Sequence, residues 1–133
     1  MQGLGDMPLR ILIVDDNTDT AESLAFLLQT SGHETRTAYT GEGAIEGATE
    51  FRPDAILLDV GLPDADGFEV ARLLRANPEF RRTLLIGATG YGSDRARAIA
   101  AEVGFDHYLV KPFDLGRLDQ ILAMAASPRP MPN

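Results

Sequence analysis

The chain has 133 residues, 44% of them hydrophobic and 24% charged, which predicts one soluble globular domain. Its 12 basic and 20 acidic residues give a formal net charge of −8, which argues against a nucleic-acid backbone or an anionic membrane as the main partner. Cysteine is absent, which excludes disulfides and thiolate metal sites. No apolar run approaches the length needed to span a membrane and no secretory signal is found, so we expect a cytoplasmic protein.

Short apolar or β-branched runs alternate along the chain with segments of helical spacing. Strands are predicted over residues 9–14, 34–39, 55–58, 83–88 and 107–110. The second of these alternates polar and apolar side chains, which indicates an edge strand. A helix is predicted after each strand, and four of the five have an expected N-cap: Asp19, Asp66, Ser93 and Asp114.

This alternation of strands and helices predicts an α/β domain. Short buried strands joined by helices favour a parallel sheet with helices on both faces, because parallel neighbours need crossover connections. We expect residues 1–8 to form a flexible lead-in and residues 9–126 the domain. Residues 127–133 carry three prolines and are expected to form a flexible tail.

Polar residues follow four of the strands at their carboxyl ends. They are Asp15 and Asp16, Asp59, Thr89 and Lys111. If the first, third, fourth and fifth strands are neighbours, these groups meet at the edge where open α/β sheets bind ligands. Converging carboxylates repel one another unless a cation is present, and oxygen ligands suit a hard cation such as Mg²⁺. The set describes a phosphoryl site in which Asp59 can act as nucleophile.

These motifs resemble those of the receiver domain of two-component response regulators, over residues 9–124. The matching elements are Asp15-Asp16, Leu58-Asp59 with Pro63 and Asp66-Gly67, Ala88-Thr89-Gly90, and the segment from Tyr108 to Phe113. The resemblance implies a CheY-like, flavodoxin-like fold, with a doubly wound sheet of five parallel strands in the order 2-1-3-4-5 and five helices. Residues 60–63 and 89–92 are also similar to receivers attached to hybrid sensor kinases.

The resemblance implies a phosphoacceptor and a metal site. Asp59 would accept a phosphoryl group from a phosphohistidine of a sensor histidine kinase or a histidine phosphotransfer protein. Asp16, Asp59 and the backbone carbonyl of Gly61 would bind Mg²⁺ directly, with Mn²⁺ as an alternative ion, and Asp15 would act largely through water. Asp64 and Asp66 are expected to serve the turn and the helix cap instead of the metal.

The resemblance also implies a switch. Lys111 would pair with the phosphoryl group, and the peptide bond before Pro112 is typically cis in such domains. Thr89 would move to donate a hydrogen bond to the phosphoryl oxygen and Tyr108 would follow it inward, which shifts the population between two conformers. The surface of the fourth helix, fifth strand and fifth helix would then change, and it is the expected contact for a downstream effector protein or for a second copy in a homodimer.

Two positions concern the lifetime of the phosphorylated state. Gly61 and Tyr91 occupy the positions that tune acyl phosphate hydrolysis in this family. Gly61 has no side chain to orient water, and Tyr91 could shield the site. We expect a lifetime that is not especially short.

Two other functions remain open beside the phosphorylation switch. One is a pseudo-receiver, a binding module that is never phosphorylated, although neither Asp59, Lys111 nor the acidic pair is lost. The other is a phosphatase with an aspartyl nucleophile. Such hydrolases usually place an acid two residues after the nucleophile, where this chain has Gly61. We therefore predict a switch whose only chemistry is self-phosphorylation and dephosphorylation, and not an enzyme.

Overall fold

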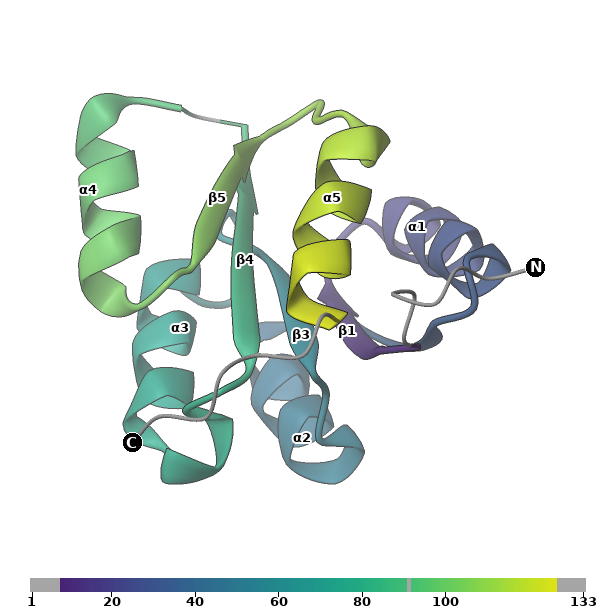
Figure 1. Ribbon diagram of the computed structural model, residues 1–133. Coiled ribbons are helices and arrows are strands. Elements are labelled where there is room, and N and C mark those ends of the chain that lie inside the picture. Colours follow the sequence, from purple (N-terminus) through teal and green to yellow (C-terminus); the bar gives the residue numbers. More distant parts are fainter. Residues whose placement is uncertain (1–7, 91, 127–133) are drawn as a thin grey trace.

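The apolar runs of the sequence form a five-stranded parallel sheet with helices on both faces (Figure 1). The computed structural model describes residues 8–90 and 92–126. The strands are β1 (Arg10–Val14), β2 (Glu34–Ala38), β3 (Ala55–Asp59), β4 (Leu84–Thr89) and β5 (His107–Val110). Their order, β2-β1-β3-β4-β5, confirms the predicted topology and places β2 at an edge. Apart from Pro8, the predicted lead-in and the predicted tail lie outside the described residues.

The helices form two layers, one on each face of the sheet. One layer contains α1 (Thr18–Thr30) and α5 (Leu115–Ala126), and the other contains α2 (Gly41–Phe51), α3 (Gly67–Ala76) and α4 (Asp94–Val103). A short 3₁₀ helix, η1 (Pro78–Phe80), follows α3. In the part of the chain that the structure describes, none of these helices has the length and apolar character needed to cross a bilayer.

Each central strand supplies side chains to both layers because successive residues of a strand point to opposite faces. In β1, Leu12 packs with α2 to α4, whereas Ile11 and Ile13 pack with α1 and α5. All three are at most 2% exposed. Full burial of such a side chain contributes about 1.5–3 kcal/mol, so these strands are held firmly from both sides.

Three of the four predicted N-caps are confirmed by the structure, and one is wrong. The side chains of Asp66, Ser93 and Asp114 accept hydrogen bonds from the first turns of α3, α4 and α5, as predicted. For α1 the prediction of Asp19 was wrong, because Asn17 is the cap and accepts from Thr20 N at 3.0 Å. Asn17 is the last residue with extended backbone, so Asp19 already lies inside the first turn, where its charge favours the helix dipole.

Asp64 caps a helix to which it does not belong. Both of its carboxylate oxygens accept from the backbone N–H of Gly41, the first residue of α2, at 3.1 and 3.0 Å. A carboxylate at a helix N-terminus is favourable both as a hydrogen-bond acceptor and as a charge. This contact ties the loop after β3 to α2, in keeping with the expected role of Asp64 in the loop.

Arg75 of α3 joins three elements at the amino-terminal edge of the sheet. Its guanidinium donates to the carbonyl oxygens of Phe80, Thr83 and Gly104, each at 2.8 Å, and to Asp106 Oδ2 at 2.7 Å. The Arg75 side chain is 21% exposed. One side chain therefore satisfies backbone carbonyls from η1, the start of β4 and the end of α4.

Candidate functional site

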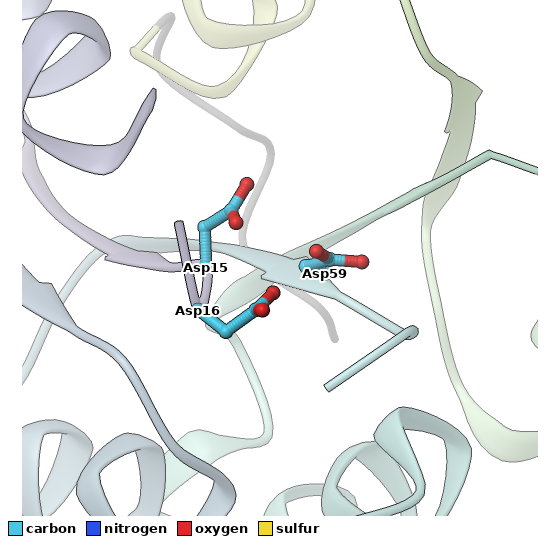
Figure 2. A group of neighbouring side chains, drawn as sticks. All are labelled: Asp15, Asp16 and Asp59. Atoms are coloured by element: carbon cyan, nitrogen blue, oxygen red, sulfur yellow. The ribbon is translucent and has the colours of Figure 1, made fainter. Parts of the chain in front are cut away.

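Three carboxylates meet at the carboxyl end of the sheet (Figure 2). Asp15 and Asp16 follow β1, and Asp59 is the last residue of β3, the neighbouring strand. One oxygen from each of the three lies within 4.8 Å of the others. Asp15 and Asp59 are buried, whereas Asp16 is exposed. The structure thus brings together the acids that the sequence places at this edge.

Lys111, the only lysine of the chain, lies against the two buried acids. Its Nζ donates to Asp15 Oδ2 at 2.8 Å and to Asp59 Oδ2 at 3.1 Å. One ammonium faces three carboxylates, so the site has an excess of negative charge. Such a site attracts a cation, and a divalent ion would balance it.

The surroundings of Lys111 shift its pKa in two directions. Burial by itself would lower the pKa, but the hydrogen bonds that Lys111 donates to Asp15 and Asp59, with the charges of the two carboxylates, outweigh burial and raise it. Lys111 is therefore charged at neutral pH. Because the folded pKa is the higher one, the stability that this charge contributes is fully present below the ordinary lysine pKa and is lost only as pH rises through the folded value.

A pH titration of Lys111 should show this elevated pKa directly. Protein grown with ¹³Cε-lysine should give a single side-chain signal, because the chain contains one lysine. We expect the midpoint to lie above that of an unstructured lysine peptide and to fall in Asp59→Asn, which removes one of the two charged acceptors. A midpoint at or below the peptide value would contradict the paired geometry.

The remaining oxygens of the buried acids hold the loops of the site. Asp15 Oδ1 accepts from Asn17 N, and Asp59 Oδ1 accepts from Gly61 N, both at 2.9 Å. Each buried acid therefore has one oxygen on Lys111 and the other on its own loop, which fixes its orientation. Asn17 was not predicted as a site residue from the sequence, although an Asn directly before a helical pattern is itself an N-cap signal.

The predicted switch residues lie on β4 and β5. Thr89 ends β4, is 3% exposed, and its carbonyl oxygen accepts from Lys111 N at 2.6 Å. Tyr108 is half-buried on β5. The Lys111–Pro112 peptide bond is cis. Tyr91, predicted to tune the phosphoryl lifetime, lies outside the described residues.

A groove of about 600 Å³ runs beside Lys111, between α1 and the start of α5. Its lining includes Leu24, Leu27, Lys111, Pro112, Phe113 and Leu115. Leu27 and Leu115 are 43% and 42% exposed. The groove therefore offers apolar contact area directly next to the ammonium group.

The model of the response regulator receiver domain family matches residues 11–123 of the chain. The transcriptional regulatory protein PrrA of Mycobacterium leprae is 43% identical over 109 residues, which is 82% of this chain and 46% of PrrA. The chemotaxis response regulator CheY4 of Vibrio cholerae has a TM-score of 0.82 at 29% identity, covering 90% of this chain and 99% of CheY4. The receiver domain of a Pseudomonas aeruginosa sensor histidine kinase, solved with a magnesium ion in its active-site cleft, has a TM-score of 0.80 at 31% identity, covering 90% and 98%.

The chain belongs to the response regulator receiver domain family of two-component signalling. It spans about half the length of the curated relatives that it matches. The transcriptional role that PrrA's name states belongs to full-length PrrA, of which the match covers 46%. The prediction of no nucleic-acid partner rests on the acidic charge of this domain and applies to this domain alone.

Proposed function

We propose that Asp59 accepts a phosphoryl group from a phosphohistidine. The observation that carries this is the position of Lys111 Nζ, which bridges Asp59 and Asp15 beside the exposed Asp16. A carboxylate oxygen of Asp59 would attack the phosphorus atom, forming a P–O bond as the P–N bond to the histidine breaks. The imidazole nitrogen keeps the electron pair of that bond and takes up a proton.

The donor set at this edge suits a hard divalent cation. Asp16, Asp59 and the backbone carbonyl of Gly61 would hold Mg²⁺, with Asp15 acting through water, and Mn²⁺ would use the same oxygen ligands. When bound, the ion neutralises charge on the phosphoryl oxygens. The magnesium ion in the similar Pseudomonas receiver supports this assignment.

The other groups would bind the phosphoryl oxygens and transmit the change. Lys111 would pair with one oxygen and Thr89 would donate a hydrogen bond to another, with Tyr108 following Thr89 inward. We propose that this alters the surface of α4, β5 and α5, which would contact an effector or a second copy of the chain. Gly61 and Tyr91 would set the lifetime of the acyl phosphate. We propose no further enzymatic activity.

The mass of the intact protein tests this proposal. Incubation with Mg²⁺ and acetyl phosphate should add one phosphoryl group to the parent, with no addition in Asp59→Asn or without Mg²⁺. Asp119→Asn, the same change at an exposed acid of α5, should behave as the parent does. If the parent gains no phosphoryl group and does not bind beryllofluoride with Mg²⁺, the chain is a binding module that is not phosphorylated.

We propose that the protein donor, a sensor kinase or a histidine phosphotransfer protein, docks in the groove beside Lys111. We also propose that the exchange takes place in the cytoplasm. Leu27 is an exposed apolar residue of that groove. Burial of such an apolar side chain against a partner is favourable, so its replacement by a charged residue weakens docking without changing the reacting groups.

Leu27→Asp should separate docking from chemistry. Transfer from a phosphotransfer protein that phosphorylates the parent should fall at least about tenfold, whereas labelling by acetyl phosphate should stay within about twofold. Leu73→Asp, at a residue of α3 that is 55% exposed, should leave both rates near those of the parent. Equal losses with both donors would place Leu27 outside the docking surface.

A further inference from the structure

Gly87 interrupts the buried strand β4 close to the site. All six residues of β4 are buried. Alternate residues share a face, so Leu85, Gly87 and Thr89 lie on the side of the sheet covered by α3 and α4. Glycine inside a strand weakens it and often marks a place where another group approaches closely. Gly87 is not among the residues predicted from the sequence, although glycine within an apolar run is such a signal.

The group that approaches Gly87 is the ring of Tyr108. The two residues pair directly across β4 and β5. A Cβ atom at residue 87 would lie 2.7 Å from Tyr108 Cδ1 and 3.1 Å from Phe105 Cε1. Carbon atoms in contact prefer separations of about 3.5–4.0 Å, so any side chain at residue 87 would force the ring to move.

Two other aromatic rings limit where the Tyr108 ring can go. Phe68 is stacked on it with ring centroids 6.1 Å apart, and Phe105 is tilted against it at the same centroid distance. Phe68 is the second residue of α3, and Phe105 directly precedes the turn into β5. The ring is therefore held by α3 and by the start of β5, while the space over Gly87 accommodates it on the sheet.

We propose that Gly87 is a positioning residue for Tyr108, which keeps the ring on β4 next to Thr89. Thr89 lies two residues further along the same face, paired with Val110 just as Gly87 pairs with Tyr108. A ring that packs over Gly87 can follow a movement of Thr89. A methyl group at residue 87 would occupy the space that the ring needs. The inference rests on the proposed function, in which phosphorylation of Asp59 moves Thr89.

Fluorine NMR can follow Tyr108 and the site in one spectrum. The chain has three tyrosines, so protein labelled with 3-fluorotyrosine should give three signals, and Tyr108→Phe identifies that of Tyr108. Beryllofluoride with Mg²⁺ serves as the probe of the site, and its own bound fluorine signals report occupancy separately. In the parent, we expect bound beryllofluoride signals and a shift of the Tyr108 signal by more than its line width.

Gly87→Ala is the test variant, and Gly90→Ala is the matched control, because a Cβ at residue 90 would meet no atom within 4 Å. In Gly87→Ala, bound beryllofluoride should still appear, but the Tyr108 signal should start at a different position and should not respond. Gly90→Ala should leave the starting position of the Tyr108 signal as in the parent. A Tyr108 signal that starts and moves in Gly87→Ala as in the parent would overturn the proposal.

A double-mutant cycle tests the contact between residue 87 and the Tyr108 ring even if Gly87→Ala folds poorly. Urea unfolding should show that Gly87→Ala lowers the ratio of folded to unfolded protein at least about tenfold, since overpacking displaces side chains. In a Tyr108→Val background, the same change should lower the ratio by less than about threefold. Equal losses in both backgrounds would overturn the proposal.

The two proposals fail in different ways. Absence of bound beryllofluoride in the parent would refute the proposed phosphoryl site, and the double-mutant cycle would still decide whether Gly87 positions Tyr108. Bound beryllofluoride in the parent without any shift of the Tyr108 signal would refute the coupling between Tyr108 and the site, and with it this inference.

Discussion

Replacing Lys111 with methionine should lower the rate of phosphorylation by acetyl phosphate at least about 100-fold, the usual effect of removing a charged group that stabilises a transition state. Lys111 Nζ is 3.1 Å from Asp59 Oδ2 and is charged at neutral pH. Methionine keeps most of the length of the side chain but removes the charge and the donor. The measurement is the time course of the phosphorylated mass with Mg²⁺ present.

The same variant should also be less stable without Mg²⁺. The side chains of Asp15 and Asp59 are 8% and 11% exposed, and without Lys111 each loses its positively charged partner. We expect a loss of about 2 kcal/mol in the free energy of unfolding, below the usual cost of breaking a fully buried pair because Lys111 is partly exposed. Mg²⁺ should restore part of this loss if, as proposed, it binds among the same carboxylates.

Arg117→Met is the control for Lys111→Met. It removes one positive charge from an exposed position of α5 and should change neither the phosphorylation rate nor the stability by a comparable amount. If Lys111→Met is phosphorylated at the parental rate, Lys111 has no role in the reaction. If its stability does not respond to Mg²⁺, the carboxylates are not the metal ligands.

Replacing Arg75 with methionine should cause a large loss of stability although Arg75 lies outside the site. The guanidinium donates to Asp106 and to four backbone carbonyls, three of them at 2.8 Å and that of Arg81 at 3.5 Å. Each buried acceptor left without a donor costs about 1–3 kcal/mol. Some of these groups can reach water, so we expect a total of about 3 kcal/mol. That is a large share of the 5–15 kcal/mol typical of a folded domain. Urea unfolding followed by circular dichroism measures it.

Arg72→Met is the matched control on the same helix. Arg72 makes an exposed ion pair with Glu69, with side chains 60% and 53% exposed. Surface pairs of this kind contribute little, so the loss should stay below about 1 kcal/mol. Equal effects of the two substitutions would mean that the contacts of Arg75 do not hold α3, β4 and α4 together.

The sheet and the place of the site could be predicted from the residues alone. Buried parallel strands have continuous apolar runs; the run at residues 55–58 is unbroken, and that at residues 9–14 is interrupted only by Arg10. Because all strands run in one direction, polar residues at their carboxyl ends must share one edge. Asp15, Asp59 and Lys111 could therefore be grouped before any coordinates, although they are 44 to 96 positions apart.

The contacts between side chains of the sheet, helices and loops could not be predicted, because they depend on how the helices pack. Nothing in the local pattern shows that Asp64 caps α2, or that Arg75 reaches carbonyls of η1, β4 and α4. These contacts join segments whose distance depends on how the helices pack, and long side chains can reach several partners. The packing of the Tyr108 ring against Gly87 likewise depends on the tertiary structure. It depends on the register of β5 against β4 and on the rings of Phe68 and Phe105, which helix packing brings to the same place.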